Sequence, residues 1–191
     1  MPTDDALLDG AATLLAARPA ASMDDVARAV GVSRATLFRR FPSRSALVGA
    51  LCRQAVEAFV AATEPVAEDL ADDLAGDLGG DCVSALRGLV ARLVPLGSRY
   101  GLLTSQPLDD LVEQELLGRA AAGEDRIRAL VRRGQEAGSF RVDVDPEWVL
   151  TALTWLVGGA ADGVRLGRLA PARVEAAVTD TVLRLLLRDA G

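Results

Sequence analysis

Signals that stop one helix and start the next are crowded into the stretch ASMDDVARAVGVSRATLFRRFP, and they allow only short helices joined by tight turns. Ser22, followed three residues later by Asp25, forms a capping-box pattern in which each side chain satisfies a free backbone N–H group. Gly31 tolerates the left-handed backbone that ends such a helix, Ser33 can cap the next helix, and Pro42 breaks it. The spacing therefore predicts a helix, a three-residue turn and a second helix, which is a helix-turn-helix.

The rest of the chain also follows a helical pattern. Thr3 can cap a first helix that ends at Pro19, and another helix begins after Ser43 and runs from the head into the body. Further breaks are expected where proline or glycine stands, near residues 65, 76–80, 97–101, 123, 138 and 167–171. The predicted fold is all-α: a three-helix helix-turn-helix head over residues 1–45, joined to a helical bundle of about six helices over residues 46–191.

Four arginines and no acidic residue lie between residues 32 and 47, in a chain whose net charge is −6. They are Arg34, Arg39, Arg40 and Arg44. Residues 1–51 hold six arginines against five aspartates, so the remaining 140 residues carry the negative charge. A weakly basic head on an acidic body is typical of a protein whose head meets phosphates while its body resists nonspecific collapse onto nucleic acid.

A helical wheel separates the two sides of the second helix of this motif. With Leu37 placed toward the core, Ala35 and Arg39 point outward, and Thr36 and Phe38 flank them. The small Ala35 side chain would let the backbone approach the floor of a DNA groove, and Arg39 could donate two hydrogen bonds to guanine. The wheel therefore predicts that this helix reads double-stranded DNA.

The segment MDDVARAVGVSRATLFRRFPSRSALVGAL resembles the DNA-binding head of the TetR family of bacterial transcriptional repressors, over roughly residues 6–52. The resemblance implies phosphate contacts for Ser22, Ser33, Arg40 and Arg44, and base contacts for Arg34, Thr36 and Arg39. It also places Phe38 against the DNA backbone or a thymine methyl group. The chain departs from the family at Phe38, where tyrosine is common, at Arg44, where lysine is common, and in its acidic N-terminal segment MPTDDALLD.

Several other classes of function are not expected from this composition. The chain has no histidine and only two cysteines, Cys52 and Cys82, which leaves no Ser-His-Asp or Cys-His pair and does not favour a zinc site. The segment GGAADG lacks the lysine and serine or threonine of a phosphate loop. We expect neither an enzyme nor a cofactor or metal site.

A membrane location is not expected either. The longest uncharged apolar stretch, residues 149–161, is shorter than the roughly 20 residues that span a bilayer. The N-terminus begins with acids instead of the positive flank of a secretory signal. We expect a cytoplasmic protein.

The body carries two apolar stripes that could pair with those of a second copy of the chain. They consist of Leu153, Val157, Gly158 and Ala161, and of Val174, Val178, Val182 and Leu185. Four such helices would form a homodimer interface, which the family resemblance also implies, although both stripes could instead be buried within one subunit. Tyr100, Trp148 and Trp155 are large aromatic residues with a polar handle, and we expect them to bind a small apolar or cationic effector.

The sequence thus predicts a transcriptional regulator, in the form of a repressor that a small-molecule effector releases from a palindromic operator. In that interpretation residues 1–45 bind DNA, and residues 46–191 bind the effector and the second subunit. Two alternatives remain open. The chain could be an all-helical interaction protein without sequence-specific DNA binding, or a small-molecule enzyme built on a helical bundle, which the missing histidine and the absence of a nucleotide motif disfavour.

Overall fold

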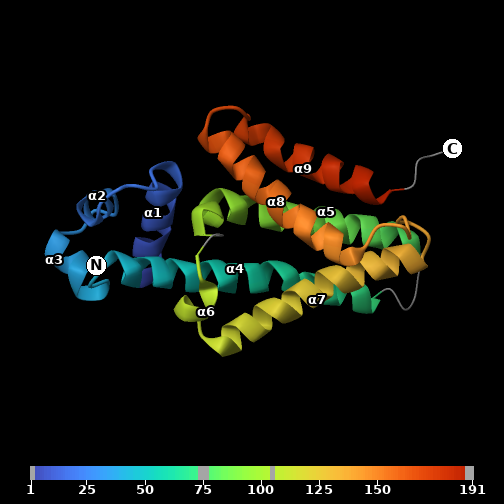
Figure 1. Ribbon diagram of the computed structural model, residues 1–191, viewed down its shortest axis with the longest axis horizontal. Helices are drawn as coiled ribbons and strands as arrows, with labels where there is room; N and C mark the ends of the chain where they lie inside the picture. Colours follow the sequence, from blue (N-terminus) through green and yellow to red (C-terminus); the bar gives the residue numbers. More distant parts are fainter. Residues whose placement is uncertain (1–2, 73–77, 104–105, 188–191) are drawn as a thin grey trace.

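The computed structural model describes residues 3–72, 78–103 and 106–187, and this part of the chain is almost entirely helical (Figure 1). The elements are α1 (Asp4–Ala17), α2 (Met23–Ala29), α3 (Arg34–Arg40), α4 (Arg44–Asp72), α5 (Leu78–Tyr100), the 3-10 helix η2 (Gly101–Leu103), α6 (Leu108–Leu111), α7 (Gln114–Glu136), α8 (Pro146–Arg165) and α9 (Pro171–Leu186). Strand-like pairing within the described ranges is limited to one isolated bridge between Phe140 and Leu187. The predicted all-α class is confirmed.

The head begins its helices at the predicted residues. Thr3 caps α1, and Ser22 and Asp25 form both halves of the capping box of α2. Ser33 caps α3 through the Thr36 N–H group. Gly31 has φ = 71°, so the turn before α3 uses the left-handed backbone that glycine adopts without strain.

Two predicted breaks in the body are wrong, because Pro65 lies inside α4 and Gly123 lies inside α7. The break expected over residues 97–101 falls at the end of that range, since Gly97 lies inside α5, which ends at Tyr100 and is followed by η2. A Cβ atom at Gly123 would lie 2.6 Å from Thr63 Oγ1 on α4, so this glycine serves the close approach of two helices and not a turn. The expected break near 76–80 falls partly outside the described residues, since α5 already begins at Leu78.

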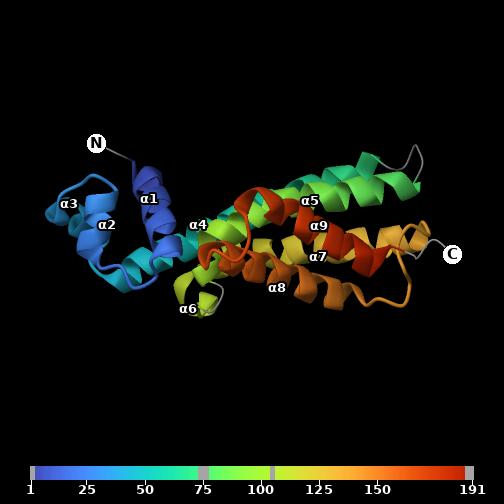
Figure 2. The same ribbon diagram turned by 90° about the horizontal axis from the view of Figure 1, so that it is seen from above.

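The breaks near residues 138 and 167 are confirmed, because Gly138 and Gly167 both have positive φ angles and follow the ends of α7 and α8. Within the bundle, α5 packs against α4, α7, α8 and α9 and so forms its centre. The head lies at one end of this elongated bundle, and α4 runs out of the head along the body (Figures 1 and 2).

The head is also held to the body by side chains around Asp9 on α1. The Asp9 carboxylate accepts a hydrogen bond from Gln54 of α4 at 3.0 Å and pairs with Arg99 at the end of α5. The apolar core of the head continues into the body through Tyr100 and Leu103. Head and body therefore share one joint built from α1, α4 and α5.

Among the described residues, one stretch of α4 (Arg44–Ala67) is long and apolar enough to cross a membrane by length and composition. This stretch is not free of charge, because Arg53, Glu57 and Glu64 interrupt it. Half of the stretch is buried inside the fold, where α4 packs against α5 and α7. The packing of the bundle thus accounts for its apolar character.

Candidate DNA-binding face and effector cavity

The second helix of the helix-turn-helix, α3, is anchored on its inner side and open on its outer side. Leu37 is completely buried. Ala35 and Arg39 are exposed, as the helical wheel predicts. Thr36 and Phe38, which flank them, are partly exposed. The outer side of α3 is therefore available to a binding partner.

Two of the four clustered arginines are paired with carboxylates. Arg34 Nη1 lies 2.9 Å from Asp24 Oδ2, and the Arg34 guanidinium lies over the Phe38 ring at 5.1 Å from its centroid. Arg40 pairs with Asp4 in the first turn of α1. A phosphate that approached either arginine would meet an ion pair and not an isolated cation.

Arg44, the first residue of α4, braces the loop between α1 and α2. Its Nη2 group donates a hydrogen bond to the backbone oxygen of Pro19 at 2.6 Å, and its Nη1 group donates to the backbone oxygen of Ala21. A planar guanidinium can hold two such acceptors in a fixed arrangement. The structure thus gives Arg44 a bracing role that the sequence did not indicate.

Arg39 differs from the other three arginines of the cluster. Its side chain is exposed and makes no hydrogen bond or ion pair within the ranges that the structure describes. A guanidinium of this kind can donate to the O6 and N7 atoms of guanine without first leaving another partner. Arg39 is therefore the side chain of this face that is best prepared to contact a base.

The two serines with predicted phosphate contacts are engaged as helix caps. Ser33 Oγ accepts from the Thr36 N–H group at 3.1 Å and lies 2.9 Å from Thr36 Oγ1. Ser22 exchanges hydrogen bonds with Asp25, and these bonds, with a smaller contribution from Arg28, lower the pKa of Asp25 from 3.8 to about 2. The Asp25 carboxylate therefore stays ionised to a lower pH than an ordinary aspartate, and its hydrogen bonds with Ser22 fix the start of α2.

We expect Arg44→Ala to destabilise the head, because the substitution removes both hydrogen bonds to the loop carbonyls. The loss should be about 1 kcal/mol, or roughly 2 to 4 °C in Tm. Because a displaced loop misplaces α2 and α3 together, affinity should fall by a similar factor for every duplex. Arg44→Lys is the matched control for charge. Its Tm should be almost as low as that of Arg44→Ala, but it should keep more of the DNA affinity. An unchanged melting curve for Arg44→Ala would show that the bonds do not brace the loop.

The body contains a cavity of about 340 Å³ between α4, α5, α7 and α8. Most of its lining is apolar and includes Ala55, Val56, Phe59, Leu93, Leu96, Ile127, Leu150 and Leu153. Polar atoms among the described lining residues come from Cys52, Tyr100, Glu124 and Thr154. Cavities of this size and composition accommodate small organic molecules.

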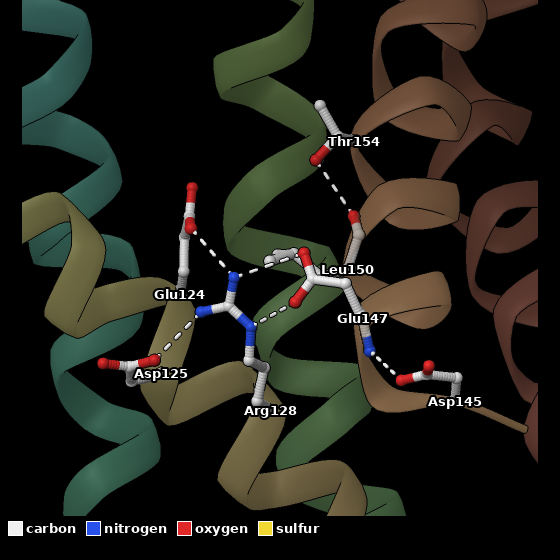
Figure 3. A network of polar contacts seen from close by, with 7 residues as sticks. All are labelled: Glu124, Asp125, Arg128, Asp145, Glu147, Leu150 and Thr154. Carbon is white, nitrogen blue, oxygen red and sulfur yellow. Dashed lines mark hydrogen bonds and ion pairs between the residues drawn. The ribbon is translucent and has the colours of Figure 1, made fainter.

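Glu124, the one carboxylate among these lining residues, belongs to a network that joins α7 to α8 (Figure 3). Arg128 donates to Glu124 Oε2 at 3.2 Å, to Asp125 Oδ1 at 3.0 Å and to Glu147 Oε2 at 2.6 Å. The bond with Arg128 lowers the pKa of Glu147, and the carboxylates raise the pKa of Arg128. The second oxygen of Glu124 points away from Arg128 (Figure 3) and leaves an acceptor for a ligand.

Of the three aromatic residues expected to bind an effector, only Tyr100 lines the cavity. Tyr100 is 7% exposed, and burial raises the pKa of its hydroxyl. Trp148 and Trp155 of α8 are 58% and 77% exposed. They are seven residues apart and face outward together, because the side of α8 that faces the cavity is formed by Leu150 and Thr154. The structure thus corrects the placement of both tryptophans.

The two stripes assigned to a dimer interface face mainly inward. The members most buried in the core of their own subunit, each at most 4% exposed, are Leu153, Val174, Val178 and Val182. Val157 and Gly158 line the cavity, and Ala161 and Leu185 are half-buried. Most of these residues are therefore buried within one subunit, as the alternative interpretation expects. The reason is that the apolar side of a helix packs into the core of its own subunit.

The sequence did not indicate the cavity residues Cys52, Glu124 and Thr154. Glu124 lies in the stretch GEDRIRALVRR, where two acids are followed by four arginines, and no signal distinguishes it from its solvent-facing neighbours. Cys52 is completely buried, and burial raises the pKa of its thiol. It therefore lines the cavity as a small apolar side chain and not as a nucleophile.

Comparison with known proteins links the head to a described family. Residues 7–51 match the family model of bacterial regulatory proteins, tetR family. The HTH-type transcriptional repressor LfrR of Mycolicibacterium smegmatis is 30% identical over 146 residues, which cover 76% of this chain and 70% of LfrR. This similarity extends beyond the helix-turn-helix into the body.

Solved structures of regulators share the fold along nearly the whole chain. The TetR-like regulator LfrR from Mycobacterium smegmatis in complex with proflavine is 24% identical, covers 96% of both chains and superposes with a TM-score of 0.70. The regulator PfmR from Thermus thermophilus is 25% identical, covers 95% of this chain and 99% of its own, and gives a TM-score of 0.67. Head and body therefore occur together in these structures in a similar arrangement.

Proposed function

Because the chain belongs to the tetR family of bacterial regulatory proteins, we propose that this transcriptional regulator is a repressor that a small-molecule effector releases from a palindromic operator. The observation that carries the proposal is the outer side of α3, where Arg39 is exposed and unpaired within the described chain. Residues 1–45 would bind DNA, and residues 46–191 would bind the effector and a second subunit. Since the chromosome is the target, the protein would work in the cytoplasm.

The roles proposed for the DNA-binding face rest on the exposed outer side of α3 and on the resemblance to the family. Arg39 and Ala35 would approach base edges, together with Thr36. Arg34, for which the resemblance implies a base contact, is paired with Asp24 and would meet a phosphate instead. The backbone of the DNA would lie against Phe38, Arg40, Arg44 and the two capping serines, Ser22 and Ser33. Contacts to phosphates set the register of the head, and Arg39 would supply most of the sequence preference.

A homodimer would use the outer face of α8 and α9. Trp148, Ala152, Trp155 and Gly159 follow one another at steps of three and four residues on α8, and all are at least partly exposed. The neighbouring α9 exposes small residues such as Ala176. Exposed tryptophans beside small residues are typical of an interface in which helices approach closely.

The effector would occupy the cavity, with Glu124 as its polar partner. An apolar lining with one carboxylate favours a flat organic molecule that carries a positive charge. Proflavine, which is bound in the LfrR structure, has these properties and is a suitable probe. Tyr100 and Thr154 would supply further hydrogen bonds.

Selection from random DNA tests the proposal even though the operator sequence is unknown. Duplexes retained by the purified protein should share a palindrome whose half-site centres lie one helical turn apart, roughly 34 Å, or a multiple of it. Cloned upstream of a reporter gene, the selected duplex should silence expression until the effector is added. A retained pool without a common sequence would instead favour an interaction protein that binds no specific DNA.

Glu124→Gln should weaken proflavine binding about fivefold to tenfold, because the neutral amide replaces the charge that faces the dye. Fluorescence titration measures the change directly. Asp125→Asn is the matched control, since Asp125 also binds Arg128 but does not line the cavity. Equal losses in both variants would show that the network as a whole acts on the dye and that Glu124 is not its direct partner.

A further inference from the structure

The DNA-binding face contains acidic residues, although a surface that meets phosphates is expected to carry only basic residues. Asp24, in the first turn of α2, pairs with Arg34 at 2.9 Å, and Asp4, in the first turn of α1, pairs with Arg40. Both aspartates are in the head, and each reaches an arginine of the cluster on another helix, α3. The pairs therefore bring together residues that the sequence separates by 10 and 36 positions.

We propose that Asp24 and Asp4 compete with DNA phosphates for Arg34 and Arg40, and thereby lower the affinity of the head for DNA, the operator included. The proposal rests on the DNA-binding function proposed above. Each carboxylate presents two oxygens to a guanidinium as a phosphate does, so the same donor cannot fully serve both acceptors.

The exchange is physically accessible at the Arg34–Asp24 pair, which lies at the surface, whereas in the second pair Asp4 is 67% exposed and Arg40 only 23%. The side chains of Arg34 and Asp24 are 68% and 48% exposed. Ion pairs between such exposed side chains are weak in water, and a nearby phosphate can replace the carboxylate. The aspartates thus do not block DNA binding, but each phosphate contact must first displace one of them.

The competition lowers the affinity for an operator and for other DNA. On an operator, Arg39 contacts a base edge and fixes the register, so phosphates are held close to Arg34 and Arg40 and displace both carboxylates, and the binding free energy is smaller by the energy of the broken ion pairs. On other sequences the head is held mainly by charge, and a pair that stays closed removes one phosphate contact and its released counterion. The internal pairs therefore reduce operator binding at least as much as nonspecific binding.

Asp24→Asn provides the test, with duplexes of the selected sequence and of its scrambled version at several salt concentrations. Affinity should rise about threefold to tenfold at low salt for the selected duplex, and by the same factor or less for the scrambled duplex. For the scrambled duplex, the dependence of log K on log salt should steepen by about 0.9 for each additional phosphate that the head neutralises. Asp4→Asn should also raise the DNA affinity, through Arg40. This variant replaces Asp24→Asn in the test if Asp24→Asn does not fold.

Asp5→Asn is the matched control for charge. Asp5 lies next to Asp4 in the same first turn and makes no ion pair within the described head, so it should change either affinity by less than about twofold. A double-mutant cycle provides a second control, because Asp24→Asn should have no further effect once Arg34→Gln has removed its partner.

Three results are decisive against the inference. If Asp24→Asn changes affinity no more than Asp5→Asn does, or raises it as strongly in the Arg34→Gln background, the aspartates act only as general surface charge and the proposed function stays intact. A wild-type protein that binds neither duplex, even at low salt, would overturn the DNA-binding function and this inference together.

Discussion

Trp155→Glu should convert the proposed homodimer into a monomer. The side chain is 77% exposed in the single subunit and lies on the outer face of α8, so its apolar surface has no cover within the described chain. In a two-fold interface every substitution occurs twice, and loss of a central tryptophan with gain of a charge should cost about 4 kcal/mol or more, roughly a thousandfold in dimer affinity. Sedimentation or light scattering at micromolar concentration measures the result.

Val142→Glu is the control for this change. Val142 is also a large exposed apolar residue, at 69%, but it lies in the connection before α8 and not on the proposed interface. The control should remain dimeric, whereas Trp155→Glu should also lose operator affinity because one subunit offers only one copy of α3. A Trp155→Glu protein that dimerises as tightly as the wild type would place the interface elsewhere.

Arg39→Ala should abolish most of the preference for the operator. Each lost base contact should cost about 1 to 3 kcal/mol on the selected duplex, and a dimer loses two. Affinity for scrambled duplexes should fall far less, so the ratio of the two affinities should collapse. Binding measured by fluorescence anisotropy on both duplexes gives this ratio.

Arg44→Ala provides the contrast, since that arginine braces a loop and does not face a base. It should weaken selected and scrambled duplexes by a similar factor. Equal and sequence-independent losses for Arg39→Ala and Arg44→Ala would show that α3 is a basic surface and does not read the sequence.

Local signals in the sequence predicted the head well. Ser22, Gly31 and Ser33 act on their own neighbours within four residues, so their effects do not depend on the rest of the fold. The helical wheel likewise placed Leu37 inside and Arg39 outside. The resemblance to the TetR family, drawn from this segment, is confirmed by the relatives.

The body was harder to predict because its features depend on contacts between distant segments. Gly123 looks like a helix break in the sequence, and only its contact with Thr63 on α4 shows why it stays helical. The ion pair between Arg34 and Asp24 cannot be predicted from the number of charged residues in a segment, because such a count does not show which side chains are in contact. Aromatic character suggests a pocket for the tryptophans of α8, but it does not reveal the direction of a side chain, and both tryptophans are exposed.

The continuity of α4 has a mechanical consequence. Arg44 at its start seats the head, and Phe59, fifteen residues later, lines the cavity, which at 1.5 Å per residue is a distance of about 22 Å. If this rigid segment pivots at its cavity end, a tilt of roughly 5° moves the head end by about 2 Å. Asp9, held by Gln54 and Arg99, ties α1 and α5 to α4 between these two ends. A hydrogen bond to a base tolerates only a few tenths of an ångström, so in the proposed mechanism a small tilt of α4 at the cavity would suffice to lift α3 from its operator.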